Sequence, residues 1–170
     1  NINNLDNLFR FLHLEKQFSF LEEETNLQIV REFVNKPTNL MCLLLQENYD
    51  KEFIPQLLKY NVIQLTKEKV QIVFDTENMI KLFIDGNLES IYSFCKIPCF
   101  EEQLVYFLNA KEFEKEIYKL FSALLNTDKF DHINFFINHK KNINLKKFTV
   151  AITNHIHQQD NVSLLKINVK

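Results

Sequence analysis

His155 and His157 are the first residues of this chain to test for chemistry, because imidazole groups ligate metals and transfer protons. They stand two positions apart in a segment with helical spacing, so their side chains face different ways. Metal sites on helices space their ligands three or four residues apart, and no cysteine or carboxylate is placed to complete a set. We therefore predict a surface or structural role for both histidines and no metal site.

The cysteines carry equally little chemistry. Cys95 and Cys99 lack the spacing of a zinc knuckle and have no second pair to complete one. With Cys42 they make three, which is too few for a disulfide framework. Cys95 and Cys99 could be joined only if Pro98 turned the chain sharply. Buried thiols in a reducing compartment are the better interpretation.

Catalytic patterns are missing from the rest of the chain. The acidic run Glu22–Glu24 and the pair Glu101 and Glu102 look like solvated faces, and a single glycine leaves no phosphate-binding loop. Nucleophile, kinase and nucleotide-binding motifs are not found. We predict that the chain is not an enzyme and that it takes no cofactor and no small-molecule substrate.

A basic segment near the C-terminus is the candidate surface for a partner or a nucleic acid. In a helix-turn-helix protein the third helix enters the major groove, and here that helix spans residues 145–159. Lysines bind phosphates, and Asn or His can reach base edges. Residues 100–170 contain no arginine, the commonest reader of bases, so protein contact is favoured over duplex DNA. The candidate residues are Lys140, Lys141, Lys146, Lys147, Asn154 and His157.

Length and composition bound the class. The 170 residues are 46% hydrophobic and 25% charged, which is typical of a soluble globular protein of one large or two small domains. No apolar run is long enough to cross a bilayer, so no membrane is expected. The chain lacks an initiator methionine and a signal peptide, so we expect a fragment of a longer protein. Residues 1–128 hold 13 Lys and Arg against 20 Asp and Glu, a net −7, whereas residues 129–170 hold 7 against 2, a net +5.

The strongest predicted element is a β-hairpin. Apolar and polar residues alternate in Val62–Thr66 and in Val70–Phe74, and the polar residues 67–69 join the two runs. Ile63 and Ile72 are expected to lead its buried faces. A short helix that starts near Pro55 comes before it, with Asn61 as its C-terminal cap.

The whole chain then divides into two similar modules. Three helices and the hairpin form the first winged-helix module, residues 1–75, and connecting helices fill residues 76–99. Residues 100–170 form the second module, in which a closing strand, Leu165–Val169, follows the third helix. The predicted fold class is mainly α with small β-hairpins (α+β), built as two tandem winged-helix modules packed together.

This order of elements resembles a known family. The helix and wing over Pro55–Phe74, and the helix and strand over Leu145–Val169, look like the C-terminal half of the Stn subunit of the CST telomere complex, in a ciliate-type version. The resemblance covers the whole chain but rests on architecture, without a diagnostic motif. It implies a nuclear, non-enzymatic module that contacts telomerase-associated proteins or DNA polymerase alpha–primase.

Two alternatives come from other classes. One is a DNA-binding winged-helix regulator. The other is an all-helical scaffold or effector-like domain, in which residues 62–74 would be helix or loop rather than a hairpin. If the family resemblance is wrong, the cytosol replaces the nucleus as the expected compartment. The partner, DNA binding, the oligomeric state and the sequence before Asn1 stay open.

Overall fold

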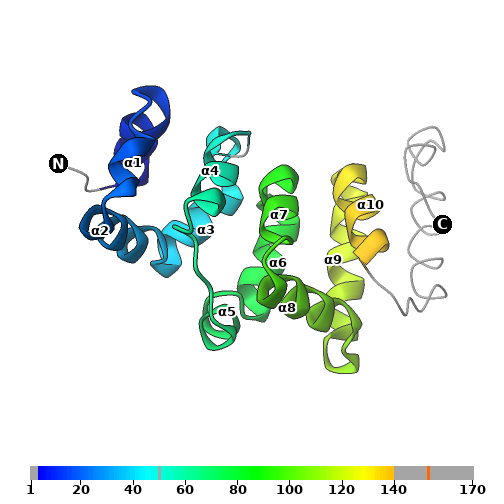
Figure 1. Ribbon diagram of the computed structural model, residues 1–170. Helices are drawn as coiled ribbons and strands as arrows, with labels where there is room; N and C mark the ends of the chain where they lie inside the picture. The colour runs from blue at the N-terminus through cyan, green and yellow to red at the C-terminus, as the bar shows by residue number, and fades with distance from the viewer. Residues whose placement is uncertain (1–3, 50, 140–152, 154–170) are drawn as a thin grey trace. The chain divides into compact units, whose positions relative to one another are not determined.

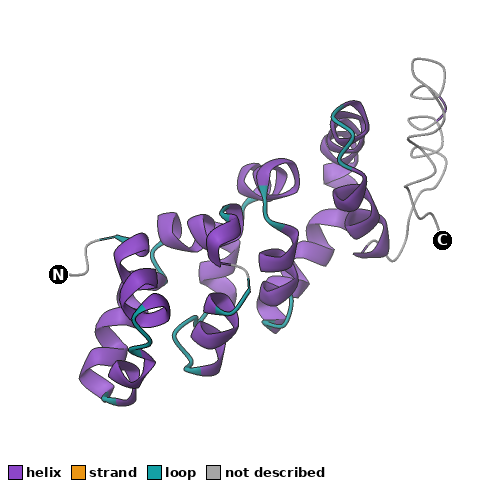
Figure 2. Cartoon of the chain, turned by 90° about the horizontal axis from the view of Figure 1, so that it is seen from above, coloured by secondary structure: helices purple, strands orange, loops and turns teal. Residues whose placement is uncertain are grey.

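A computed structural model describes residues 4–49 and 51–139 of the chain, together with Thr153 (Figure 1). In these residues the regular secondary structure is entirely helical, and Figure 2 shows helices joined by loops. The α-helices are α1 (Leu5–Phe9), α2 (Glu24–Val34), α3 (Pro37–Leu45), α4 (Phe53–Lys59), α5 (Lys67–Val73), α6 (Thr76–Asp85), α7 (Leu88–Phe94), α8 (Pro98–Asn109), α9 (Glu114–Asn126) and α10 (Phe130–His139). Shorter helical turns are Arg10–Leu14, a π-helix, and the 3₁₀ turns Phe18–Glu22, Glu47–Tyr49 and Lys111–Phe113.

Contacts between residues divide the chain into two compact units that interleave along the sequence. Unit 1 comprises Asn1–Val73 and Gly86–Phe100, and unit 2 comprises Phe74–Asp85 and Glu101–Lys170. Helices α6 and α7 were both predicted to lie in the connecting segment, residues 76–99. In the structure α6 belongs to unit 2 and α7 to unit 1. The helical content that was predicted is confirmed.

The predicted hairpin is wrong. Val62–Thr66 is a loop, and the second predicted strand lies mostly in α5. Val70 and Val73, three residues apart, are both buried on one face of that helix, while Ile72 is 73% exposed. The Thr66 hydroxyl accepts a hydrogen bond from the Lys69 amide at 3.1 Å, which caps the first turn. Without a hairpin there is no wing, so the prediction of a winged-helix fold for the first module is not supported.

In the loop Val62–Thr66, hydrogen bonds to a side chain take the place of the hydrogen bonds that a second strand would make. Asn35 is 6% exposed, and its amide nitrogen donates to the Val62 carbonyl at 2.8 Å and to the Arg31 carbonyl at 2.7 Å. Its amide oxygen accepts from the Gln64 N–H at 3.1 Å. Buried backbone groups must find partners, and one asparagine from the end of α2 supplies two of them here.

The predicted cap at Asn61 is confirmed, and its geometry repeats at Asp128. Both residues have a positive φ, 57° and 58°. After α4, the Asn61 N–H donates to the Leu58 carbonyl at 3.1 Å and the Val62 N–H to the Leu57 carbonyl at 2.8 Å, which is the Schellman arrangement. In a chain with one glycine, Asn and Asp take the left-handed position because they tolerate it best.

The core of unit 1 consists of aliphatic side chains and aromatic rings from its helices, with leucines most frequent and with valines from α2 and α5. Helices α3 and α4 both contact α7. The Asn87 N–H, at the start of α7, donates to the Leu44 carbonyl at 2.7 Å. Of the apolar residues at helical spacing in the first helix, Leu5, Leu8 and Leu12 are buried and Phe9 is half-buried. Helix α3 is apolar nearly all round, and it buries Leu40, Leu43 and Leu44 while Met41, Cys42 and Leu45 stay half-buried.

The core of unit 2 is built on Phe83 of α6. Its ring lies 6.2 Å from that of Phe107, 5.9 Å from Phe135 and 5.7 Å from Phe136, centroid to centroid. Helix α9 contacts both α6 and α10, and the Lys129 ammonium donates to the Ile84 carbonyl. Helices α6, α9 and α10 each bury a stripe of apolar residues that recur at helical spacing in the sequence.

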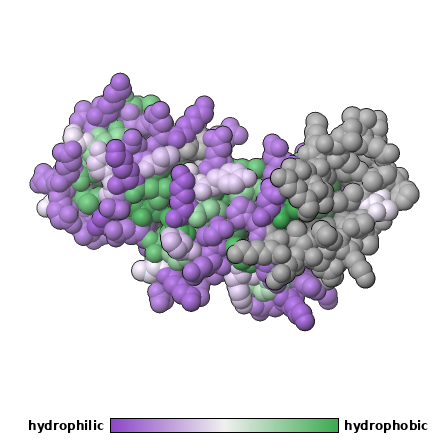
Figure 3. Space-filling view, turned by 45° about the vertical axis from the view of Figure 1, so that its right-hand side comes forward, coloured by the Kyte–Doolittle hydropathy of each residue, from purple (hydrophilic) through white to green (hydrophobic). Residues whose placement is uncertain are grey.

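The surface of the described residues is mostly polar (Figure 3). In the view of Figure 3, hydrophilic residues cover much of the described surface, with hydrophobic residues visible between them. The third helix and the closing strand of the predicted second module, residues 145–159 and 165–169, lie outside the described residues apart from Thr153, which is helical and exposed.

Candidate partner-binding site

The six residues predicted to form a partner or nucleic-acid surface all lie outside the described residues. Lys140, Lys141, Lys146, Lys147, Asn154 and His157 therefore stay a prediction. The cysteines are free thiols, but all three are of intermediate exposure, so the prediction that they are buried is wrong. Cys99 donates to the Leu65 carbonyl at 3.2 Å and so helps to hold the 62–66 loop.

An open groove in unit 1 is a candidate site in the described part of the chain. It encloses about 400 Å³, within the range of known ligand pockets. The segment after α1 supplies one wall, and α4 with the residue before it supplies the other. Its lining residues are His13, Leu14, Lys16, Phe18, Glu52 and Gln56.

Aromatic rings form a continuous layer behind the groove. The Phe18 ring stacks on Tyr60 at 5.6 Å and lies 6.5 Å from Phe53. His13 stacks on Phe9 at 5.2 Å and meets the edge of Phe18 at 6.4 Å. Such ring pairs contribute about 0.5–1.5 kcal/mol each beyond the area that they bury, so the rings stabilise this wall.

The backbone of the first wall departs from an ordinary α-helix. Residues Arg10–Leu14 form a π-helix, in which the Glu15 N–H donates to the Arg10 carbonyl at 2.8 Å. Lys16 then adopts a φ of 57°. π-turns occur often at functional sites, and a non-glycine residue with positive φ is uncommon. Together they end the helix and leave Leu14 59% exposed at the rim.

Opposite charges face this groove without neutralising each other. Lys16 and Glu52 are both exposed, and within the described residues neither forms an ion pair. Gln56 adds an amide donor and acceptor, and His13 adds a ring nitrogen. The groove can therefore contact an apolar group, an anion and a cation together.

A buried phenol supports the other side of the same aromatic layer. The Tyr49 hydroxyl donates to the Asp6 carboxylate, and its ring meets Phe9 edge-on at 5.3 Å. Burial, followed by that carboxylate, raises the pKa of Tyr49 above its ordinary value. Burial also raises the pKa of the Cys42 thiol, and the Asp6 charge adds to the effect while a hydrogen bond from Gln46 opposes it. Both groups are neutral at pH 7, which fits a structural role.

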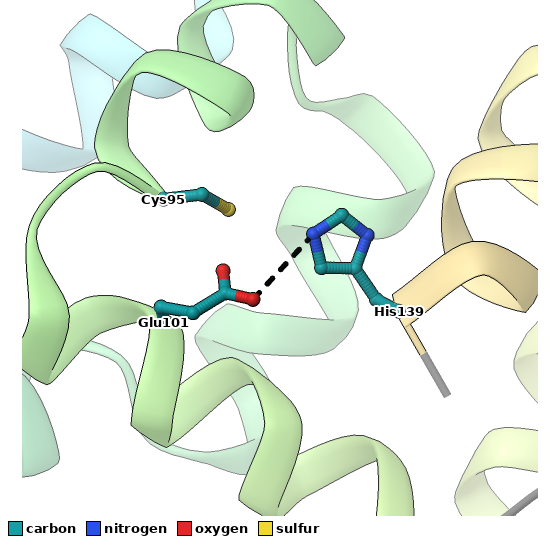
Figure 4. Close-up of side chains that lie close together, drawn as sticks. All are labelled: Cys95, Glu101 and His139. Atoms are coloured by element: carbon teal, nitrogen blue, oxygen red, sulfur yellow. Dashed lines mark ion pairs between the residues drawn. The ribbon is translucent and has the colours of Figure 1, made fainter. Parts of the chain in front are cut away.

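In unit 2 the structure brings together a pair that the sequence did not reveal. Figure 4 shows Glu101 of α8 and His139 at the end of α10, whose Oε1 and Nε2 atoms are 3.7 Å apart. The His139 ring stacks on Phe135 at 4.2 Å, and its Nδ1 lies 3.1 Å from the Phe135 carbonyl. Cys95, also drawn there, belongs to unit 1. Glu101 and His139 lie 38 positions apart in the sequence, so no local pattern signalled the pairing.

The groove was also missed by sequence reasoning. Phe9 and His13 do stand four residues apart, a spacing that brings rings together on a helix. The second wall, however, comes from Glu52 and Gln56, and only the tertiary fold brings them there.

No helix among the described residues is long and apolar enough to cross a membrane. Comparison with known proteins finds no matching protein family, no similar curated protein and no similar solved structure. The resemblance to the Stn subunit stays a prediction.

Proposed function

We propose that this chain is a non-enzymatic helical scaffold that binds another protein through the groove of unit 1. The observation that carries the proposal is an aromatic wall with Leu14 exposed at its rim and with charges at Lys16 and Glu52 that form no ion pair in the described part of the chain. An apolar centre with a polar border is the usual anatomy of a protein interface. The all-helical alternative drawn from the sequence supports the same class of function.

A photo-crosslinking amino acid at position 14 tests the proposal in cells. Ile29, on α2, is a matched control because it is 61% exposed and does not line the groove. We expect a discrete adduct from position 14, absent from position 29 and lost when Lys16→Glu is added. Mass spectrometry then names the partner. Equal adduct patterns from both positions would refute the groove as the binding surface.

A partner in a telomere or replication complex stays a hypothesis of this proposal. The hypothesis was based on the order of predicted elements, and the hairpin predicted in the first module is a loop followed by a helix. The support that is left is the basic segment near the C-terminus. The identity of the crosslinked protein tests it directly. Recovery of telomerase-associated proteins or polymerase alpha–primase would favour it.

A DNA-binding role is separable by a different experiment. A gel shift at two salt concentrations measures phosphate contacts, because such binding weakens steeply with salt. Under the present proposal Lys146→Glu with Lys147→Glu leaves crosslinking from position 14 unchanged. Tight duplex binding that those substitutions abolish would favour the DNA-binding alternative instead.

A further inference from the structure

We infer that the groove of unit 1 selects a partner segment in which an apolar side chain is flanked by one acidic and one basic residue. The inference rests on the proposed function and specifies the chemistry of the partner. It is carried by the apolar and charged groups that line the same 400 Å³ space.

The centre of the groove fits an apolar side chain. Phe18 is half-buried against Tyr60 and Phe53, and Leu14 is 59% exposed beside it. Removing such surface from water drives association, roughly in proportion to the apolar area covered. A leucine-sized or larger side chain covers both residues at once.

The two charges then select what flanks that side chain. Lys16 attracts an acidic residue and Glu52 a basic one, and no partner within the described residues already occupies either. A segment of a single sign would satisfy one of them and meet repulsion from the other. A segment with both signs satisfies the pair.

A protein segment fits better than a small zwitterion. Small ligands bury most of their surface in enclosed pockets, whereas this groove is open and leaves Leu14 exposed at the rim. Covering that rim requires neighbouring residues of a larger partner, which supply the water-excluding border of an interface.

Capped pentapeptides test the inference with the full chain. The probes are Ac-Glu-Ala-Leu-Ala-Lys-NH2, its reverse in charge order, the two versions with like charges, and a version with Ser in place of Leu. Titrations followed by ¹⁵N–¹H NMR should perturb the amides of residues 13–18 and 52–56. We expect the better mixed-charge peptide to bind about two- to fivefold more tightly than either like-charged one, the range of one exposed ion pair.

Charge-reversed variants make the prediction specific. Lys16→Glu should move the preference to the peptide with two lysines, and Glu52→Lys to the peptide with two glutamates. Lys115→Glu, an exposed lysine on α9, should change neither. Equal affinity for all peptides, perturbation of other residues, or no binding overturns the inference. The crosslink from position 14 tests the scaffold proposal without peptides. A discrete crosslink together with equal affinity for all peptides would overturn the inference and leave the scaffold proposal in place.

Discussion

Ser90 of α7 carries a fully buried hydroxyl that has no hydrogen-bond partner among residues 4–49 and 51–139. An unsatisfied buried polar group costs about 1–3 kcal/mol, and alanine is the better helix former. We therefore expect Ser90→Ala to raise the free energy of unfolding by about 1 kcal/mol, measured by urea denaturation monitored by circular dichroism.

Thr66→Ala is the matched control, because it removes a hydroxyl that does form a hydrogen bond. That oxygen accepts from the Lys69 N–H and caps α5, and loss of such a cap costs about 0.5–2 kcal/mol. The two alanine substitutions should therefore change stability in opposite directions. Destabilisation by both would mean that Ser90 has a partner.

Tyr49 makes stability depend on alkaline pH. Burial and the Asp6 carboxylate raise its pKa in the folded chain, whereas the unfolded phenol titrates near pH 10, roughly the model-peptide value. A raised pKa contributes stability that is complete below the unfolded value and is lost as the pH rises above it. Tyr49→Phe should make the stability fall less steeply above about pH 10 in denaturation curves taken at several pH values.

Phenolate absorbance at 295 nm gives the control for Tyr49. The chain has five tyrosines, and Tyr49 should not ionise until the protein unfolds. The folded-state titration of Tyr49→Phe should therefore match that of the parent chain. Loss of one phenolate near pH 10 in the variant would contradict the buried pair with Asp6.

At the scale of single residues, the sequence identified Asn61 as a cap because a glycine-poor chain must use asparagine in left-handed positions. It could not identify Lys16, since nothing in a lysine favours a positive φ. Its place at the helix end explains the conformation, because the Gln17 N–H donates to the Leu12 carbonyl at 3.0 Å, the same kind of bond that closes α4 after Asn61.

Among the elements, the 62–66 loop depends on Asn35. Replacing it with alanine would remove the partner of the Val62 carbonyl in a buried site and that of the Gln64 N–H in a partly buried one. We expect Asn35→Ala to lower the free energy of unfolding by about 1–3 kcal/mol, the cost of one buried unsatisfied group, because water can reach the exposed residue Gln64. Hydrogen exchange of the Gln64 amide should accelerate in the same variant.

Asn39→Ala is the control for that loop. Asn39 makes one side-chain hydrogen bond, to the Phe33 carbonyl at 2.8 Å, and does not touch the loop. Its loss should cost about 1 kcal/mol and leave exchange at Gln64 unchanged. Equal effects of the two substitutions would show that Asn35 is not specific to the loop.

The hairpin was predicted wrongly because residues 70–74 fit two periods. Val70, Ile72 and Phe74 alternate like a strand, yet Val70 and Val73 also share a helical face. Short apolar runs are ambiguous in this way, and tertiary contacts decide them. Asn35 lies 27 residues before Val62, so its role in the loop was invisible to local patterns.

For the whole molecule, the 17 phenylalanines had two explanations, exposed anchors for a partner or filling for cores that lack tryptophan. Most of the largest fully buried side chains are phenylalanines, which favours the second. Phe9 and Phe18, in the aromatic layer of the groove, are only half-buried. In unit 1, therefore, some phenylalanines are available as anchors for a partner. The spacing of apolar residues predicted the helices and the composition allowed an aromatic core, but neither could place the groove.

Chemical shifts of residues 62–74 test the account most directly, since they separate a helical scaffold from a winged-helix module. In ¹³C-labelled full chain, we predict helical Cα shifts for Lys67–Val73, sequential i to i+3 contacts, and contacts between Asn35 and the 62–64 loop. Strand-like shifts, with cross-strand contacts between 62–66 and 70–74, would contradict it.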